Sequence, residues 1–171
     1  MGTFESEKSL GGANKILIRH QGEFDFQKLT DSILSWMKNK GYFIDYKDQT
    51  EVIRPEGKDS IYEWKTDRQP IPYIKFYIDV TINTFQVNDV VVEVNGKQKK
   101  MQTGDLQVRI DGKWEKNYNE TFPNTKFGEF LRRLYERYVA FSRLKGYWGK
   151  IYGEILELGE VAKKALELNT R

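Results

Sequence analysis

The chain has 171 residues and a formal net charge of +3, with 39% hydrophobic and 31% charged residues. This balance indicates a folded domain and excludes a disordered chain. Cysteine is absent and histidine occurs once, as His20. Disulfides, thiolate metal sites and most histidine-based sites are therefore excluded, and we expect no cofactor and no metal.

Residues 1–14 contain Gly11 and Gly12 and show little periodicity, which predicts a flexible tail ahead of a single domain at 15–171. Gly2 fits the loose pattern for N-myristoylation. There is no secretory hydrophobic segment and no run of roughly 18 apolar residues that would span a membrane. We expect a cytoplasmic protein.

The first predicted elements are a buried strand at 16–18 and a helix that begins after Asp25, its N-cap. Gly41 is well placed to end this helix. Strands are then expected at 42–53 and 60–66, separated by turn residues at 55–57.

Residues 73–85 alternate regularly, so that one face is apolar and the other is wet or covered by semi-polar groups. The dipeptide Asn95-Gly96 predicts a hairpin between strands at 90–94 and 97–101. A turn at Thr103-Gly104 is expected to lead into a last alternating strand. The predicted apolar face of residues 73–85 consists of Ile74, Phe76, Ile78, Val80 and Ile82.

These elements predict an α+β fold: a curved antiparallel sheet of five to six strands, with one N-terminal helix and a long C-terminal helix packed on it. The order of elements loosely resembles the helix-grip architecture of START and Bet v 1-like lipid carriers. A curved sheet and an aromatic helix could enclose an apolar ligand cavity, lined by Phe76, Ile78 and Trp114.

Several short motifs, taken in order along the chain, resemble a family of small uncharacterised archaeal proteins. The resemblance implies a single cytoplasmic domain from an archaeon, and it carries over no functional residue because the family has no assigned activity. The motifs are Gly22-Glu23-Phe24, Trp36 to Tyr42, Asn95-Gly96-Lys97 followed by Lys100-Met101, and Trp114-x-x-x-Tyr118.

Catalytic residues are weakly indicated. Glu63, Asp67 and Asp79 could form an acid–base or metal pair if the sheet brought them together, but alternating strands place carboxylates on wet faces throughout. His20 beside Glu23 could be a general base, although a lone histidine near a strand end is more often a structural hydrogen-bond partner. No phosphate-binding loop, nucleophile elbow or metal-ligand motif is present, so the sequence favours a protein that is not an enzyme.

Residues 125–168 are the most informative segment, because their three-four apolar spacing predicts one very long or once-broken helix. Its first half, 126–150, contains seven basic residues and only two glutamates. Basic side chains among aromatic ones can hold phosphate backbones or anionic lipid headgroups, whereas the alternative is a merely solvated face. The candidate anion-binding residues are Arg132, Arg133, Arg137 and Arg143.

Four small residues line one side of this helix at spacings of four, three and four: Ser142, Gly146, Gly149 and Gly153. Glycine costs up to about 1 kcal/mol in a helix interior, so the pattern requires a reason. One reason is the close approach of another helix, with Trp148, Tyr152 and Ile155 completing the interface. The other is a break at Lys145-Gly146, after which a second helix folds back as a hairpin.

The leading hypothesis is a non-enzymatic binding or self-assembly module, in which 147–168 projects as a helix that pairs with a second copy or another chain. About 40 helical residues would reach about 60 Å, which exceeds the width of one domain. A carrier of a hydrophobic ligand or lipid is the alternative. Weak binding of nucleic acid or an anionic membrane is third, and Lys97, Lys99 and Lys100 would add to that surface.

Overall fold

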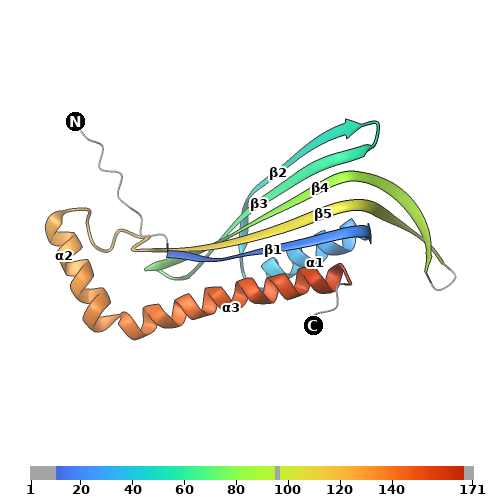
Figure 1. Cartoon of the computed structure of the whole chain (residues 1–171). Coiled ribbons are helices and arrows are strands. Elements are labelled where there is room, and N and C mark those ends of the chain that lie inside the picture. The colour runs from blue at the N-terminus through green and yellow to red at the C-terminus, as the bar shows by residue number, and fades with distance from the viewer. Residues whose placement is uncertain (1–10, 95–96, 168–171) are drawn as a thin grey trace, which may run out of the picture.

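The computed structural model describes residues 11–94 and 97–167 and has an α+β fold. Five strands form one antiparallel sheet in the order β1-β5-β4-β3-β2. Figure 1 shows that the sheet is curved and that α1 and α3 run along one side of it. The elements are β1 (Gly11–Phe24), α1 (Phe26–Asn39), β2 (Phe43–Arg54), β3 (Gly57–Ile71), β4 (Ile74–Val94), β5 (Lys97–Lys116), α2 (Lys126–Leu134), η1 (Tyr135–Val139) and α3 (Phe141–Ala165).

The predicted fold class is confirmed, with a single N-terminal helix and a long C-terminal helix on an antiparallel sheet. β1 already begins at Gly11, so the last four residues of the expected tail belong to a strand. Gly2 and the Asn95-Gly96 turn lie outside the described residues. The strands on either side of that turn pair as expected, with Val94 opposite Lys97.

Helix α1 starts and ends where the sequence predicts. Asp25 is the N-cap, and its Oδ1 accepts a hydrogen bond from the backbone N–H of Lys28 at 2.9 Å. Gly41 follows the last turn with φ +79°, a conformation that favours glycine. The buried face of α1 consists of Leu29, Thr30, Ile33, Trp36 and Met37.

Strands β4 and β5 are longer than the sequence predicts, because the expected turn at Thr103-Gly104 is not a turn. Both residues lie inside β5, where Gly104 pairs with Gly22 of β1 and has φ +156°. The pairing of β4 with β5 shifts between Phe85 and Asn88, and such a bulge sharpens the local bend of a strand. The two strands therefore form one bent ribbon, which Figure 1 shows reaching beyond the rest of the sheet.

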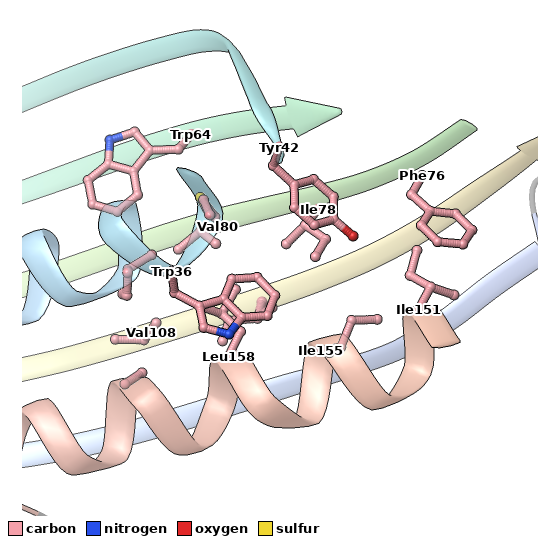
Figure 2. Packing of buried hydrophobic residues seen from close by; sticks show 14 of the residues in the cluster. Trp36, Tyr42, Trp64, Phe76, Ile78, Val80, Val108, Ile151, Ile155 and Leu158 are labelled. Carbon is pink, nitrogen blue, oxygen red and sulfur yellow. The ribbon is translucent and has the colours of Figure 1, made fainter. Parts of the chain in front are cut away.

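The alternation predicted for 73–85 is confirmed on its apolar side, since Ile74, Phe76, Ile78 and Ile82 are fully buried. The buried residues of β5 face the same layer, among them Leu106, Val108 and Ile110. Figure 2 shows Ile151, Ile155 and Leu158 of α3 facing these strands, with Trp36 of α1 beside them. The core therefore lies between the sheet and the two helices.

A buried ion pair fixes α3 to the sheet and to the end of α1. Arg68 of β3 donates to both carboxylate oxygens of Glu154 at 2.7 Å, and the hydroxyl of Tyr42 donates to Glu154 at 2.6 Å. Arg68 also donates to the carbonyl oxygen of Lys40 at 2.7 Å. Burial, followed by the hydrogen bond to Glu154, raises the pKa of Tyr42 well above its ordinary value.

The C-terminal segment bends once, near Ala140, and not at Lys145-Gly146. Helix α3 is continuous from Phe141 to Ala165, so the predicted alternative of a hairpin beginning at Gly146 is wrong. Residues 151–166 lie against the sheet and α1, whereas the segment before Ala140 extends past the end of the sheet in Figure 1. The core thus takes up the second half of the long helical segment and leaves the first half outside.

Candidate functional site

The segment that lies largely outside the core, which we call the arm, comprises residues 126–141: α2, η1, the buried Ala140 and the first residue of α3. Thr125 caps its start, because the side-chain oxygen of Thr125 accepts a hydrogen bond from the N–H of Gly128 at 3.0 Å. Gly128 is buried against the preceding loop, and a Cβ at this position would lie 2.0 Å from the carbonyl oxygen of Pro123. The loop and the arm therefore form one unit.

The polar side of the arm is anchored to the end of the sheet. Glu136 accepts hydrogen bonds from the hydroxyl of Tyr73 at 2.7 Å and from Nζ of Lys116 at 2.6 Å. The rings of Tyr73, Phe122 and Tyr135 pack together, with centroids 5.4–6.3 Å apart. Burial, followed by the hydrogen bond to Glu136, raises the pKa of Tyr73 well above its ordinary value.

The anchor residues Tyr135 and Glu136 open η1, a single turn of π-helix. A π-turn adds one residue to a helical turn and is common where helices carry functional residues. Here it follows directly on Leu134, the last residue of α2. The arm can thus turn Tyr135 and Glu136 toward the sheet while other side chains face away from it.

The opposite side of the arm is apolar and exposed, which reverses the usual orientation of an amphipathic helix. Phe127 and Tyr138 are 69% and 73% exposed. Large exposed apolar patches on a protein mark interaction surfaces. We call this surface the outer face of the arm; it comprises Phe127, Phe130, Leu131, Leu134, Tyr138 and Val139.

The predicted anion-binding arginines lie on or next to the arm. Arg133, Arg137 and Arg143 are exposed, and Arg132 is half-buried. Arg137 also lies over the ring of Tyr138, with its guanidinium 5.7 Å from the ring centroid. The structure therefore places one of these basic side chains, that of Arg137, next to an exposed aromatic ring. Lys99 is exposed at the far hairpin and pairs with Asp25 at 2.7 Å.

A second feature lies inside the bend between the arm and α3, and we call it the elbow hollow. It has a volume of about 570 Å³. Its apolar walls come from Trp114 of β5 and from Phe141, Leu144 and Trp148 of α3. The charged residues that line it are Arg133, Arg137, Lys145, Lys116 and Glu136.

The small residues Ser142, Gly146, Gly149 and Gly153 lie on the exposed side of α3. A Cβ added at any of the three glycines would meet no atom within 4 Å, so no packing inside the described molecule explains them. The rings of Trp148 and Tyr152 stack beside this stripe, with centroids 5.8 Å apart. Ile155, expected in the same interface, is fully buried in the core.

The residues expected around a ligand cavity are separated in the structure. Phe76 and Ile78 are fully buried in the layer beneath α3. Figure 2 shows Phe76 close to Ile151 and Ile78 on the neighbouring stretch of β4, so side chains fill this interior. Trp114 lies at the elbow hollow, at the end of the sheet.

Two of the three acidic residues considered for catalysis, Asp67 and Asp79, belong to an ion-paired sheet surface. Asp67 pairs with Lys75 at 3.2 Å, and Asp79 pairs with Lys113 at 3.1 Å. Nε2 of His20 lies 2.8 Å from the carbonyl oxygen of Glu23, which is the structural role expected for it. Within 11–94 and 97–167, no group of three His, Cys, Asp or Glu side chains is placed to hold a metal ion.

Sequence reasoning missed the anchor and the elbow hollow. Tyr73, Lys116 and Glu136 come from three distant segments, and nothing in their spacing links them. Trp114 and Trp148 also meet at the hollow from different elements. The sequence offered one signal for the anchor. Glu129 and Glu136 are the only two acidic residues in the strongly basic first half of the predicted helix, and an acidic side chain in such a place indicates a bonding partner elsewhere in the chain.

Neither the protein-family models nor the curated proteins compared with this chain match it. Among the described residues, no helix is long and apolar enough to cross a membrane.

Proposed function

We propose that this protein is a non-enzymatic module that docks on an anionic membrane surface through the arm. The observation that supports this most is the reversed orientation of the arm, whose outer face stays exposed while Glu136 is held against the sheet. A helix with aromatic and leucine side chains on one face and basic residues beside them lies in the plane of a membrane interface. The outer face offers two phenylalanines and a tyrosine for such insertion.

Charge favours a membrane over a second copy of the arm. The exposed charged residues of the arm are Lys126, Glu129, Arg133 and Arg137, so basic groups predominate. Two arms that packed against each other would bring like charges together, which is unfavourable. An anionic leaflet attracts each nearby Lys or Arg by about 1 kcal/mol, and the apolar face adds burial.

Vesicle co-sedimentation tests this proposal, with phosphatidylglycerol and phosphatidylcholine vesicles compared at matched salt. We expect the wild type to bind the anionic vesicles, and we expect Phe127→Ser combined with Phe130→Ser to lose binding. Arg133→Glu combined with Arg137→Glu should weaken binding and remove its salt dependence. Phe43→Ser is the matched control, because Phe43 is 67% exposed but lies in β2, away from the arm.

The proposal is wrong if the wild type fails to bind anionic vesicles at low salt. It is also wrong if Phe43→Ser lowers binding as much as the double change in the arm. Circular dichroism of each variant would show that the fold is intact, because exposed substitutions contribute little to stability.

A second candidate function is self-association through the exposed glycine stripe of α3. The observation that favours it is the open space over Gly146, Gly149 and Gly153, beside the stacked rings of Trp148 and Tyr152. Light scattering over a concentration series would measure the association. Gly149→Leu should abolish association if a second helix packs there, and a strictly monomeric wild type would exclude this function.

A further inference from the structure

The elbow hollow has the size and lining of a small-molecule site. Its volume of about 570 Å³ lies within the roughly 300–1,000 Å³ range of ligand pockets. Four large apolar side chains form its walls: Trp114, Phe141, Leu144 and Trp148. Leu144 is buried and Trp148 is 44% exposed, so the walls run from the core out to the surface. An alkyl chain could lie along such a surface.

The polar residues of the hollow select for negative charge. Lys116 and Glu136 neutralise each other, since their charged atoms are 2.6 Å apart. The other three charged residues that line the hollow, Arg133, Arg137 and Lys145, are all basic. No described carboxylate lies within 4.0 Å of these three cations. Their charge is therefore available to an anion.

Trp114 also carries an unsatisfied donor, although this nitrogen is buried and does not open into the hollow. Nε1 of Trp114 is buried and has no hydrogen-bond acceptor within the described part of the chain. Buried polar groups are normally paired, and each exception requires an explanation. The Trp114 ring lies 5.9 Å from Nζ of Lys116.

We propose that the elbow hollow binds a single-chain anionic amphiphile, with its carboxylate or phosphate group among Arg133, Arg137 and Lys145. Arginine matches the two oxygens of either group with paired donors. The alkyl chain packs between Phe141, Leu144 and Trp148. This inference rests on the proposed function and deepens it, because Arg133 and Arg137 belong to the arm and a lipid bound there would come from the membrane on which the arm lies.

Isothermal titration tests this inference on the full chain, with decyl phosphate and decanoate below their micelle concentrations and decanol below its solubility limit. We expect saturable binding of both anions and none of the neutral alcohol. Inorganic phosphate should compete weakly, because it lacks the chain. A higher affinity for decyl phosphate than for decanoate would assign the site to phospholipid headgroups. A higher affinity for decanoate would assign it to free fatty acids.

Variants separate this site from the outer face of the arm. Lys145→Gln should weaken decyl phosphate binding about tenfold, and Trp148→Ala should weaken it further. Lys150→Gln is the matched control, because Lys150 is an exposed lysine of α3 that does not line the elbow hollow. Phe127→Ser combined with Phe130→Ser should keep decyl phosphate binding while losing vesicle binding.

Equal binding of decanol and decyl phosphate would overturn the inference, as would equal effects of Lys145→Gln and Lys150→Gln. Vesicle binding without any decyl phosphate binding would reject the hollow and keep membrane docking. Decyl phosphate binding without vesicle binding would reject membrane docking and the lipid source, and would leave a site for soluble anionic amphiphiles.

Discussion

The arm and the second half of α3 belong to one helical segment, yet they expose opposite kinds of surface. In α3 the apolar residues Ile151, Ile155 and Leu158 are fully buried. In the arm Phe127, Tyr138 and Phe141 are more than 60% exposed. The difference arises because α3 lies along the sheet, whereas the arm passes its end and is held there through Glu136.

The comparison shows that apolar periodicity identifies a face without identifying what covers it. Residues 127–141 and 151–166 have the same three-four spacing. The apolar residues of 151–166 complete the core, and we propose that those of 127–141 contact a surface outside the molecule.

The largest contrast is expected between Ile155→Asp and Phe130→Asp. A carboxylate at Ile155 would be buried without a partner, so we expect a loss of more than about 4 kcal/mol of folding stability. The change at Phe130, which is 56% exposed, should stay within about 0.5 kcal/mol. Urea unfolding measures both, and similar losses would show that the arm is part of the core.

Glu154→Ala should cost about 3–5 kcal/mol, because it leaves Arg68 buried without its partner. The side chains of Arg68 and Glu154 are only 15% and 7% exposed. Glu160→Ala is the matched control on the same helix, since its pair with Lys163 is largely exposed and should contribute about 0.5 kcal/mol or less. Equal losses of stability in thermal unfolding of the two variants would contradict the stabilising role of the buried Arg68–Glu154 ion pair.

Tyr73→Phe tests the anchor of the arm through its pH dependence. The raised pKa of Tyr73 means that its contribution is complete below the unfolded-state value of about 10 and is lost as the pH rises further. The variant should therefore be about 1.5–3 kcal/mol less stable than the wild type at pH 8, because a hydrogen bond to a charged group is removed. This difference in urea unfolding should shrink above pH 10, and a constant difference would exclude the Tyr73–Glu136 contact as its cause.

The smallest effect is expected at Gly149, and Gly128, which has the opposite surroundings, is its comparison. Gly149→Ala should raise stability by up to about 1 kcal/mol, since alanine favours a helix and its Cβ meets nothing within 4 Å. Gly128→Ala should lower stability, because its Cβ would lie 2.0 Å from the carbonyl oxygen of Pro123. Hydrogen exchange at residues 126–139 would locate the second effect, and unchanged protection there would contradict it.

Much of the fold could be predicted from local signals. Asp25 and Gly41 bound α1, and the alternation from Ile74 to Ile82 defines the buried face of β4. The predicted turn at Thr103-Gly104 is wrong, because Gly104 lies within a bent strand and the chain does not reverse there. A glycine and a polar neighbour produce the same local pattern in both cases, and only pairing with β1 and β4 distinguishes them.

The candidate site could be predicted only in part. The basic and aromatic residues of the arm are evident in the sequence, including Arg133 and Arg137. Their exposure depends on where the sheet ends and on the contact of Glu136 with Tyr73, which lies 63 residues away along the chain. Long-range contacts of this kind leave no mark on local periodicity.

The place of β1 in the sheet has a consequence for how the chain folds during synthesis. β1 is synthesised before the other strands, but its partner is β5. Ile16 can therefore pair with Ile110, and Ile18 with Val108, only after more than half of the chain has been synthesised. Strands β2 to β5 pair with their neighbours in sequence and can form earlier. Closing such a distant pair slows folding. Until β1 arrives, one side of β5 is an unpaired edge that other nascent chains could join.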